Sequence, residues 1–318
     1  MASADQVKAL IRSHAEGDDE RFYSVAMQAA AQEARSGHGL LAQELRELVD
    51  RAKAKAAAQP AASRSLSVPL VQPQGELAGL LAAAYPRTRL DDMVLDDAIR
   101  ERLDNVVLEQ RQQSRLAEHG LSPIRKLLLV GPPGVGKKMS AAGLAGELGL
   151  PMFSPQLDGL ITKFMGETAA NLRIVFEAIQ LTLGVYLFDE FDALWRNQAC
   201  FELVLVLLEH DDSNGLVIAT TNHPTLIDRA IYRRFDSVIE YTLPTSSVAE
   251  TIMRARLAFL NSDQIEWAEA AKATEGLSHA DITRACEQAS KSAILNHSTV
   301  VDTSGLIGAL NQRRGAHR

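Results

Sequence analysis

The strongest structural signal in this chain is residues 126–149, KLLLVGPPGVGKKMSAAGLAGELG. It begins with an apolar run, Leu127–Val130, that predicts a buried strand, and it ends with an alanine-rich run that predicts a helix. A loop of glycine and proline, followed by Lys137, lies between them. Backbone N–H groups of such a loop crowd around phosphates, the helix N-terminus adds positive potential, and the lysine reaches the outer phosphates. The stretch therefore predicts a site for a polyphosphate.

The predicted phosphate-binding residues are consecutive: Gly131, Pro132, Pro133, Gly134, Val135, Gly136, Lys137, Lys138 and Met139. One of them departs from the usual pattern, in which Ser or Thr follows the lysine and its hydroxyl holds Mg²⁺. Lys138 is a donor only and cannot coordinate a cation. Its ammonium would repel Mg²⁺, or would itself partly neutralise the β- and γ-phosphates. Ser140 points to another side of the helix and is a poor substitute.

Polar residues follow two further apolar runs. Asp189 and Glu190 come directly after residues 185–188, and Asn222 closely follows residues 216–220. Beside a phosphate loop, Asp189 would orient Mg²⁺ and its waters, and Glu190 would polarise the attacking water. Asn222 would hold that water or contact the outer phosphate, although Asn is also common in turns. Because ligands of parallel sheets bind at the carboxyl ends of the strands, we expect these side chains near the loop.

Short apolar runs that alternate with helical segments predict a parallel sheet with helices on both faces. The predicted strands are 127–130, 152–154, 185–188, 216–220 and 238–241. After Pro244 the pattern is helical only, with segments at 247–260, 263–274, about 279–295 and 302–312. Ser278 is the predicted N-cap of the third of these helices.

The N-terminal quarter of the chain has a different composition. Residues 1–54 have helical spacing throughout, and residues 55–75 are rich in Ala, Ser, Pro and Gln, which predicts a flexible linker. We therefore expect an N-terminal helical region at 1–54, a linker at 55–75, an α/β nucleotide-binding domain at 76–244 and a helical lid at 245–318.

Arg233 and Arg234 stand in tandem before the last predicted strand. They are either a solvated surface pair or arginine fingers that neutralise charge on a phosphate bound by a neighbouring subunit.

Together, four motifs resemble those of the AAA family of ATPases, which are P-loop NTPases. They are GPPGVGK at 131–137, VYLFDEFDAL at 185–194, ATTNHP at 219–224 and LIDRAIYRRFD at 226–236. The resemblance covers about residues 76–318 and is closest to bacterial single-module members with a short helical N-terminal region. It implies a five-stranded α/β domain followed by a helical lid, a homo-oligomeric ring that is typically hexameric, and ATP with Mg²⁺ at the subunit interface.

The resemblance also implies roles for single residues. Gly131 to Lys137 would bind phosphate, Asp189 and Glu190 would form the acidic pair, Asn222 would be the sensor, and Arg233 and Arg234 would act on the next subunit's ATP. The stretch around Met93 and Val94 would line the adenine. Lys163, Phe164 and Met165 resemble the pore loop of ring-forming unfoldases, in which an aromatic side chain grips a threaded polypeptide; alternatively, Phe164 is a core residue.

Two departures from the family bear on activity. Because Lys138 replaces the residue that binds Mg²⁺, we expect ATP binding to survive better than hydrolysis. The segment 192–209 is shorter than in the family, and the loop that would line the lower part of a central pore is missing from it. Trp195 in this segment is either an interface anchor or a packing residue.

The sequence also argues against several other classes of protein. Two cysteines cannot form a disulfide framework and suit a reducing cytoplasm, and the N-terminus has no apolar core of signal-peptide length. No apolar run is long enough to span a bilayer. The net charge of −7 argues against bulk affinity for nucleic acid. With neither an H-E-x-x-H nor a C-x-x-C motif, no zinc site is expected.

The primary hypothesis is a cytoplasmic ring-forming ATPase that remodels or unfolds protein clients, with the N-terminal helices recruiting a client or a partner protease. The alternative is a hydrolysis-impaired member that acts as an ATP-gated scaffold or switch, which Lys138 favours. Remodelling of nucleic acid would need a basic surface that the sequence does not show.

Overall fold

A computed structural model of the protein describes residues 75–160, 165–196, 198–223 and 229–316, together with Met27, Gln43 and Pro73. The chain divides into two compact units, Met1–Leu66 and Ser67–Arg318, and the architecture described below belongs to the second. Met27 and Gln43 are helical. The rest of the predicted N-terminal helices and most of the predicted linker lie outside the described residues.

The second unit contains a mixed sheet of six strands in the order β1-β3-β4-β5-β2-β6. The strands are β1 (Leu81–Ala84), β2 (Lys126–Val130), β3 (Met152–Pro155), β4 (Val185–Phe188), β5 (Leu216–Thr221) and β6 (Ser237–Glu240). All pairings among β2 to β6 are parallel, which confirms the five predicted strands.

Strand β1 was not predicted, and it extends the sheet with an antiparallel edge. Leu81 pairs with Pro155 and Ala84 with Met152. The strand reads LAAA, and alanine has a low intrinsic preference for strands. It is therefore the pairing with β3, a contact distant in sequence, that holds this segment extended.

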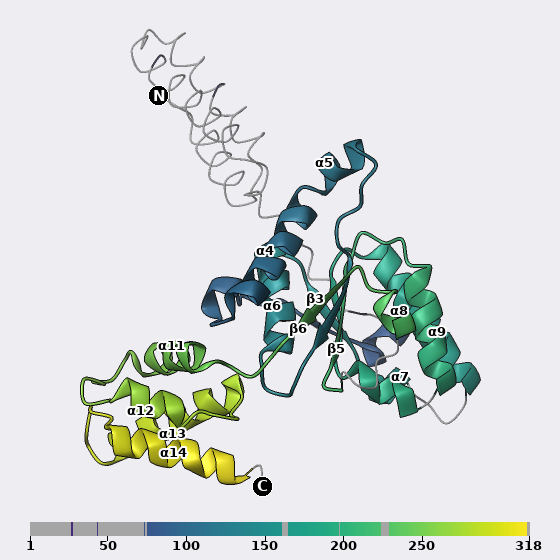
Figure 1. Cartoon of the computed structure of the whole chain (residues 1–318). Coiled ribbons are helices and arrows are strands. Elements are labelled where there is room, and N and C mark those ends of the chain that lie inside the picture. Colours follow the sequence, from purple (N-terminus) through teal and green to yellow (C-terminus); the bar gives the residue numbers. More distant parts are fainter. Residues whose placement is uncertain are drawn as a thin grey trace, which may run out of the picture. The chain divides into compact units, whose positions relative to one another are not determined.

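Helices cover both faces of the sheet, as expected. They are α4 (Asp97–Arg111), α5 (Gln113–Glu118), α6 (Lys137–Leu148), α7 (Leu157–Leu160), α8 (Met165–Leu181), α9 (Gln198–Glu209) and α10 (Arg229–Tyr232), with 3-10 turns η2 (Gly75–Gly79), η3 (Leu90–Asp92) and η4 (Phe191–Arg196). Leu127 and Leu129 of β2 belong to a core with α4 and α6, and Leu128 and Val130 belong to a core with α8 and α9. In Figure 1 these helix pairs lie on opposite sides of the sheet.

The C-terminal part is helical, as predicted, and has its own core. Its helices are α11 (Ser246–Leu257), α12 (Trp267–Lys272), α13 (His279–Leu295) and α14 (Thr303–Ala316). Ile252, Leu257, Ile282 and Leu306 are among its buried residues. Ser278 caps α13 as predicted, because its side chain accepts a hydrogen bond from the backbone N–H of Asp281. We call this four-helix part the lid.

Among the described residues, none of the helices has the length and apolar character that crossing a membrane requires.

Candidate functional site

The loop between β2 and α6 depends on glycine. Gly131, Gly134 and Gly136 have φ of 150°, 78° and 100°, which a residue with a side chain rarely adopts. A Cβ at Gly131 would also collide with the backbone carbonyl of Tyr241. The loop therefore wraps tightly in front of α6, whose first residue is Lys137. A glycine-built cradle at the start of a helix is suited to phosphate.

Lys137 is buried, with 7% of its surface exposed. Its ammonium donates hydrogen bonds to the carbonyls of Gly131 at 2.7 Å and Pro132 at 2.8 Å, and to Asn222 Oδ1 at 2.8 Å. Burial lowers the pKa of Lys137, while the charges of Asp189 and Asp192 raise it. The ammonium therefore faces the inside of the glycine loop, where it can donate to a phosphate bound there. The structure thus brings Asn222 and the loop lysine together, although they are 85 residues apart.

The acidic pair lies at the end of β4, beside Thr220 of β5. The Thr220 hydroxyl donates to Asp189 Oδ1 at 2.7 Å and accepts from the Glu190 backbone N–H at 3.1 Å. Glu190 has a φ of 51°, in the left-handed region that is costly for a residue with a side chain. Thr220 thus holds both members of the pair, and sequence reasoning did not identify it.

Lys138 reaches the same carboxylate from the other side. Its Nζ lies 3.3 Å from Asp189 Oδ2. Ser140, the nearest hydroxyl along α6, is fully buried; it donates to the Gly136 carbonyl at 3.2 Å and accepts from the Tyr241 hydroxyl at 2.7 Å. The Mg²⁺ ion that the resemblance implies therefore finds no hydroxyl ligand on α6, and a cation already faces Asp189. These residues do not fit the expected metal site.

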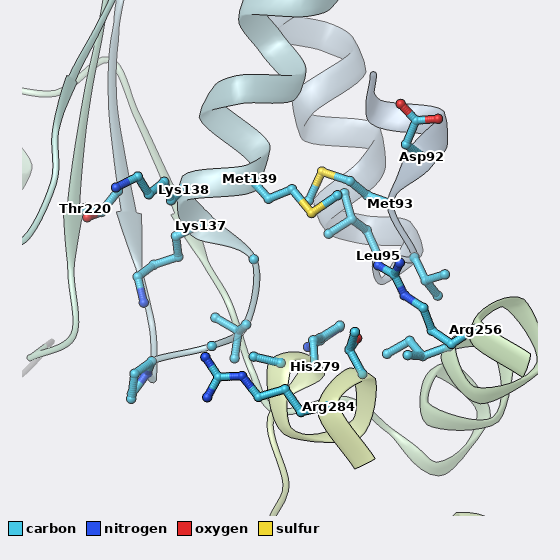
Figure 2. Close-up of a pocket in the computed structure, with 18 of the residues that line it drawn as sticks. Asp92, Met93, Leu95, Lys137, Lys138, Met139, Thr220, Arg256, His279 and Arg284 are labelled. Atoms are coloured by element: carbon cyan, nitrogen blue, oxygen red, sulfur yellow. The ribbon is translucent and has the colours of Figure 1, made fainter. Parts of the chain in front are cut away.

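A pocket of about 740 Å³ opens between the loop, the segment 92–95 and the lid. This volume is within the range of small-molecule sites. Met93, Leu95 and Met139 supply apolar lining, and Lys137 and Lys138 are among the polar residues that line the pocket (Figure 2). An apolar region beside a phosphate cradle fits a nucleoside triphosphate.

The lid contributes two arginines that sequence reasoning missed. Arg256 of α11 and Arg284 of α13 line the pocket, and Figure 2 shows the Arg284 guanidinium turned toward the phosphate loop. The backbone N–H of Ala280 donates to the Gly134 carbonyl at 3.0 Å, which joins the lid to the loop. Arg284 lies one helical turn after Ala280, so this contact places it on the side of α13 that faces the loop.

His279 also lines the pocket from the lid, and burial lowers its pKa.

The remaining predicted residues are not gathered at this pocket. Arg233 is exposed, and Arg234 forms an ion pair with Glu209 at 3.4 Å; neither belongs to the described pocket lining. Lys163 and Phe164 of the predicted pore loop lie outside the described residues, and Met165 is the first residue of α8. The roles of these residues stay predictions.

Comparison with known proteins agrees with the geometry. The family model "ATPase family associated with various cellular activities (AAA)" matches residues 127–243. A curated AAA family ATPase of Sinorhizobium fredii, y4kL, described as uncharacterized, is 33% identical over 306 residues, which are 93% of this chain and 90% of the relative. The ATP-dependent zinc metalloprotease FtsH 1 of Methylacidiphilum infernorum is 31% identical over 221 residues, but the match spans only 35% of that protein and 64% of this chain.

A crystal structure of the FIGL-1 AAA domain has a similar fold. The TM-score is 0.60 at 22% sequence identity, and the match covers 75% of this chain and 90% of that one. The glycine loop, the acidic pair and the lid thus occur in a chain that matches a named AAA family ATPase along 90% of the relative's length. This protein belongs to the AAA family of ATPases.

Proposed function

We propose that this protein binds ATP in the pocket between the phosphate loop and the lid, hydrolyses it, and uses the turnover to remodel or unfold protein clients. One observation carries this proposal. Lys137 is hydrogen-bonded to Asn222, and Thr220 joins Asp189 to Glu190, so that groups from three neighbouring strand ends meet at one pocket. Open parallel sheets bind their ligands at this edge.

Binding would use groups that already face the pocket. The Lys137 ammonium would give up its hydrogen bonds to the loop carbonyls and donate to oxygens of the β- and γ-phosphates instead. Backbone N–H groups of the loop would also donate to the phosphates. Met93 and Leu95 would pack against the adenine. The lid would close the site through Arg284 and through its hydrogen bond to Gly134.

Hydrolysis would rest on positioning and on charge. Glu190 would accept a proton from water as the water oxygen forms a bond to the γ-phosphorus. The bond from that phosphorus to the bridging oxygen would break, and ADP would leave with the electron pair. Asn222 would orient the water, and Lys137 would stabilise the charge on the departing groups.

The assembly and the partners belong to the same proposal. The exposed Arg233, with Arg234, would complete the site of a neighbouring subunit in a homo-oligomeric ring, and residues 163–165 would grip the client. Support comes from family membership and from the relative named an ATP-dependent metalloprotease. We assign residues 76–244 to the nucleotide-binding domain, 245–318 to the lid and 1–54 to recruitment of a client or a partner protease. Both cysteines are buried and neither forms a disulfide, which suits a reducing cytoplasm.

Phosphate release from ATP by the purified chain, beside Glu190→Gln, tests the enzymatic part. The natural chain is expected to release phosphate. Glu190→Gln should slow release about a hundredfold or more, because general-base catalysis contributes about 10²–10⁴-fold, while leaving ATP affinity nearly unchanged. Glu177→Gln is the matched control, since Glu177 is exposed on α8 and outside the described pocket lining. Equal turnover in Glu190→Gln and the natural chain would contradict the assignment.

A second candidate function is an ATP-gated scaffold that hydrolyses slowly or not at all. The 3.3 Å contact between Lys138 and Asp189 favours it, because it occupies the carboxylate that would organise the metal and its waters. Mass photometry with and without ATP, run beside the phosphate assay, separates the two functions. Ring assembly on ATP without phosphate release supports the scaffold.

A further inference from the structure

We propose that the Lys138 ammonium takes the place of the divalent cation in this pocket, so that the protein binds ATP without Mg²⁺. This inference rests on the proposed ATP binding and deepens it.

Asp189 is arranged to hold an ammonium. Its Oδ1 accepts from the Thr220 hydroxyl at 2.7 Å, and its Oδ2 lies 3.3 Å from Lys138 Nζ. Each carboxylate oxygen thus has a partner within the protein. The Lys138 ammonium offsets the charge of the Asp189 carboxylate, which weakens the attraction of this carboxylate for a second cation.

The hydroxyl that could replace the missing ligand is already engaged. Ser140 is fully buried, donates to Gly136 and accepts from Tyr241. Turning it toward a metal would leave the buried Tyr241 hydroxyl without its acceptor, which is costly. The first turn of α6 therefore offers the phosphates two ammonium groups and no oxygen ligand from a side chain.

The charge of ATP also favours an ammonium at this position. ATP without metal carries about four negative charges, and most of this charge is near the outer phosphates. Lys137 and Lys138 leave the start of α6 in different directions, and Arg284 approaches the loop from the lid (Figure 2). The side chain of Lys138 is 66% exposed, and exposed ion pairs are weak. Since an ammonium has three N–H donors, Lys138 can donate to a phosphate oxygen while it stays close to Asp189.

Calorimetric titration of the full chain with a non-hydrolysable ATP analogue, in excess Mg²⁺ and in excess EDTA, tests the inference. For the natural chain, the dissociation constant of the analogue in EDTA should be no more than about threefold higher than in Mg²⁺. Lys138→Thr should bind the analogue at least about tenfold more tightly in Mg²⁺ than in EDTA. The reason is that the substitution restores a metal ligand and removes a positive charge.

Two further variants isolate the cause. Lys138→Met removes the ammonium without supplying an oxygen, so its affinity should fall in EDTA and recover less in Mg²⁺ than that of Lys138→Thr. Lys291→Thr is the matched control, since Lys291 is exposed on α13 and outside the described pocket lining; it should behave like the natural chain.

The outcomes separate the two proposals. If the natural chain binds the analogue at least about tenfold more tightly in Mg²⁺ than in EDTA, this inference is overturned, but the proposed ATP binding stands. The same metal dependence in Lys138→Thr and the natural chain also overturns it. Failure to bind the analogue in either solution, by a chain that unfolds cooperatively, overturns the proposed function itself.

Discussion

Thr220→Val tests whether one buried hydroxyl positions the acidic pair. Thr220 is 2% exposed, donates to Asp189 Oδ1 at 2.7 Å and accepts from the Glu190 N–H at 3.1 Å. Valine has nearly the same shape and suits a strand. The substitution therefore removes two hydrogen bonds and leaves the packing of β5 almost unchanged.

The expected loss of stability follows from these two bonds. A hydrogen bond to a charged group contributes about 1.5–3 kcal/mol and a neutral one about 1 kcal/mol. The Asp189 side chain is 37% exposed, so water replaces part of its lost bond. We expect the free energy of unfolding to fall by about 1–2 kcal/mol.

The effect on turnover should be larger than the effect on stability suggests. Glu190 is held at a φ of 51°, a conformation that costs about 1–2 kcal/mol for a residue with a side chain. Without the bond from Thr220, the Glu190 backbone can relax and its carboxylate shifts. A shift of about 1 Å at a reacting group costs about a hundredfold in rate, so phosphate release should fall about ten- to a hundredfold, with ATP affinity changed little.

Urea unfolding, phosphate release and calorimetric ATP binding measure the three quantities. Thr274→Val is the matched control, because Thr274 is 4% exposed, donates to Ala271 at 2.6 Å and lies in the lid outside the described pocket lining. It should lose comparable stability and keep its turnover. If Thr220→Val loses stability but hydrolyses ATP as fast as Thr274→Val, the hydroxyl is only structural and the reasoning is refuted.

Two further predictions concern the lid and pH. Gly134→Ala should weaken ATP binding about tenfold or more, measured by calorimetry, because φ is 78° and the new Cβ would lie 2.5 Å from Ser278 Oγ and push the lid away; unchanged affinity would contradict this. Burial raises the pKa of Tyr241 to about 12 from 10.0, an effect that its hydrogen bond to Ser140 reduces. Between pH 10 and pH 12 the tyrosine ionises in the unfolded chain but not in the folded one. The contribution of Tyr241 to the free energy of unfolding is therefore complete below pH 10 and falls by about 2–3 kcal/mol as the pH rises toward 12. Urea unfolding across this range should show the fall, and Tyr241→Phe should reduce it.

The strand ends could be predicted from the sequence because the information is local. The run 185–188 is apolar and short, and two carboxylates follow it at once. Parallel connection then places every strand end at one edge, whatever the exact strand order. The five parallel strands were confirmed for this reason, and Lys137 and Asn222 meet as the same logic requires.

The residues that sequence reasoning missed depend on register and docking. Thr220 and Thr221 are adjacent, and only the pairing of Phe188 with Ala219 places Thr220 beside Asp189. A register shift by one residue would exchange the two threonines, and no local pattern specifies that register. Arg284 likewise acquires its position from the packing of the lid onto the loop, through contacts distant in sequence.

Lys138 shows how a single residue can change two properties of a site at once. Alanine at this position would remove the metal ligand and leave Asp189 with an unbalanced charge, which would still attract a cation. Lysine removes the ligand and also supplies a positive charge, 3.3 Å from the carboxylate. From the sequence alone, repulsion of Mg²⁺ and replacement of Mg²⁺ were equally consistent with this lysine. The proposed replacement fits the geometry, because the Ser140 and Thr220 hydroxyls are engaged and the exposed Lys138 ammonium faces Asp189.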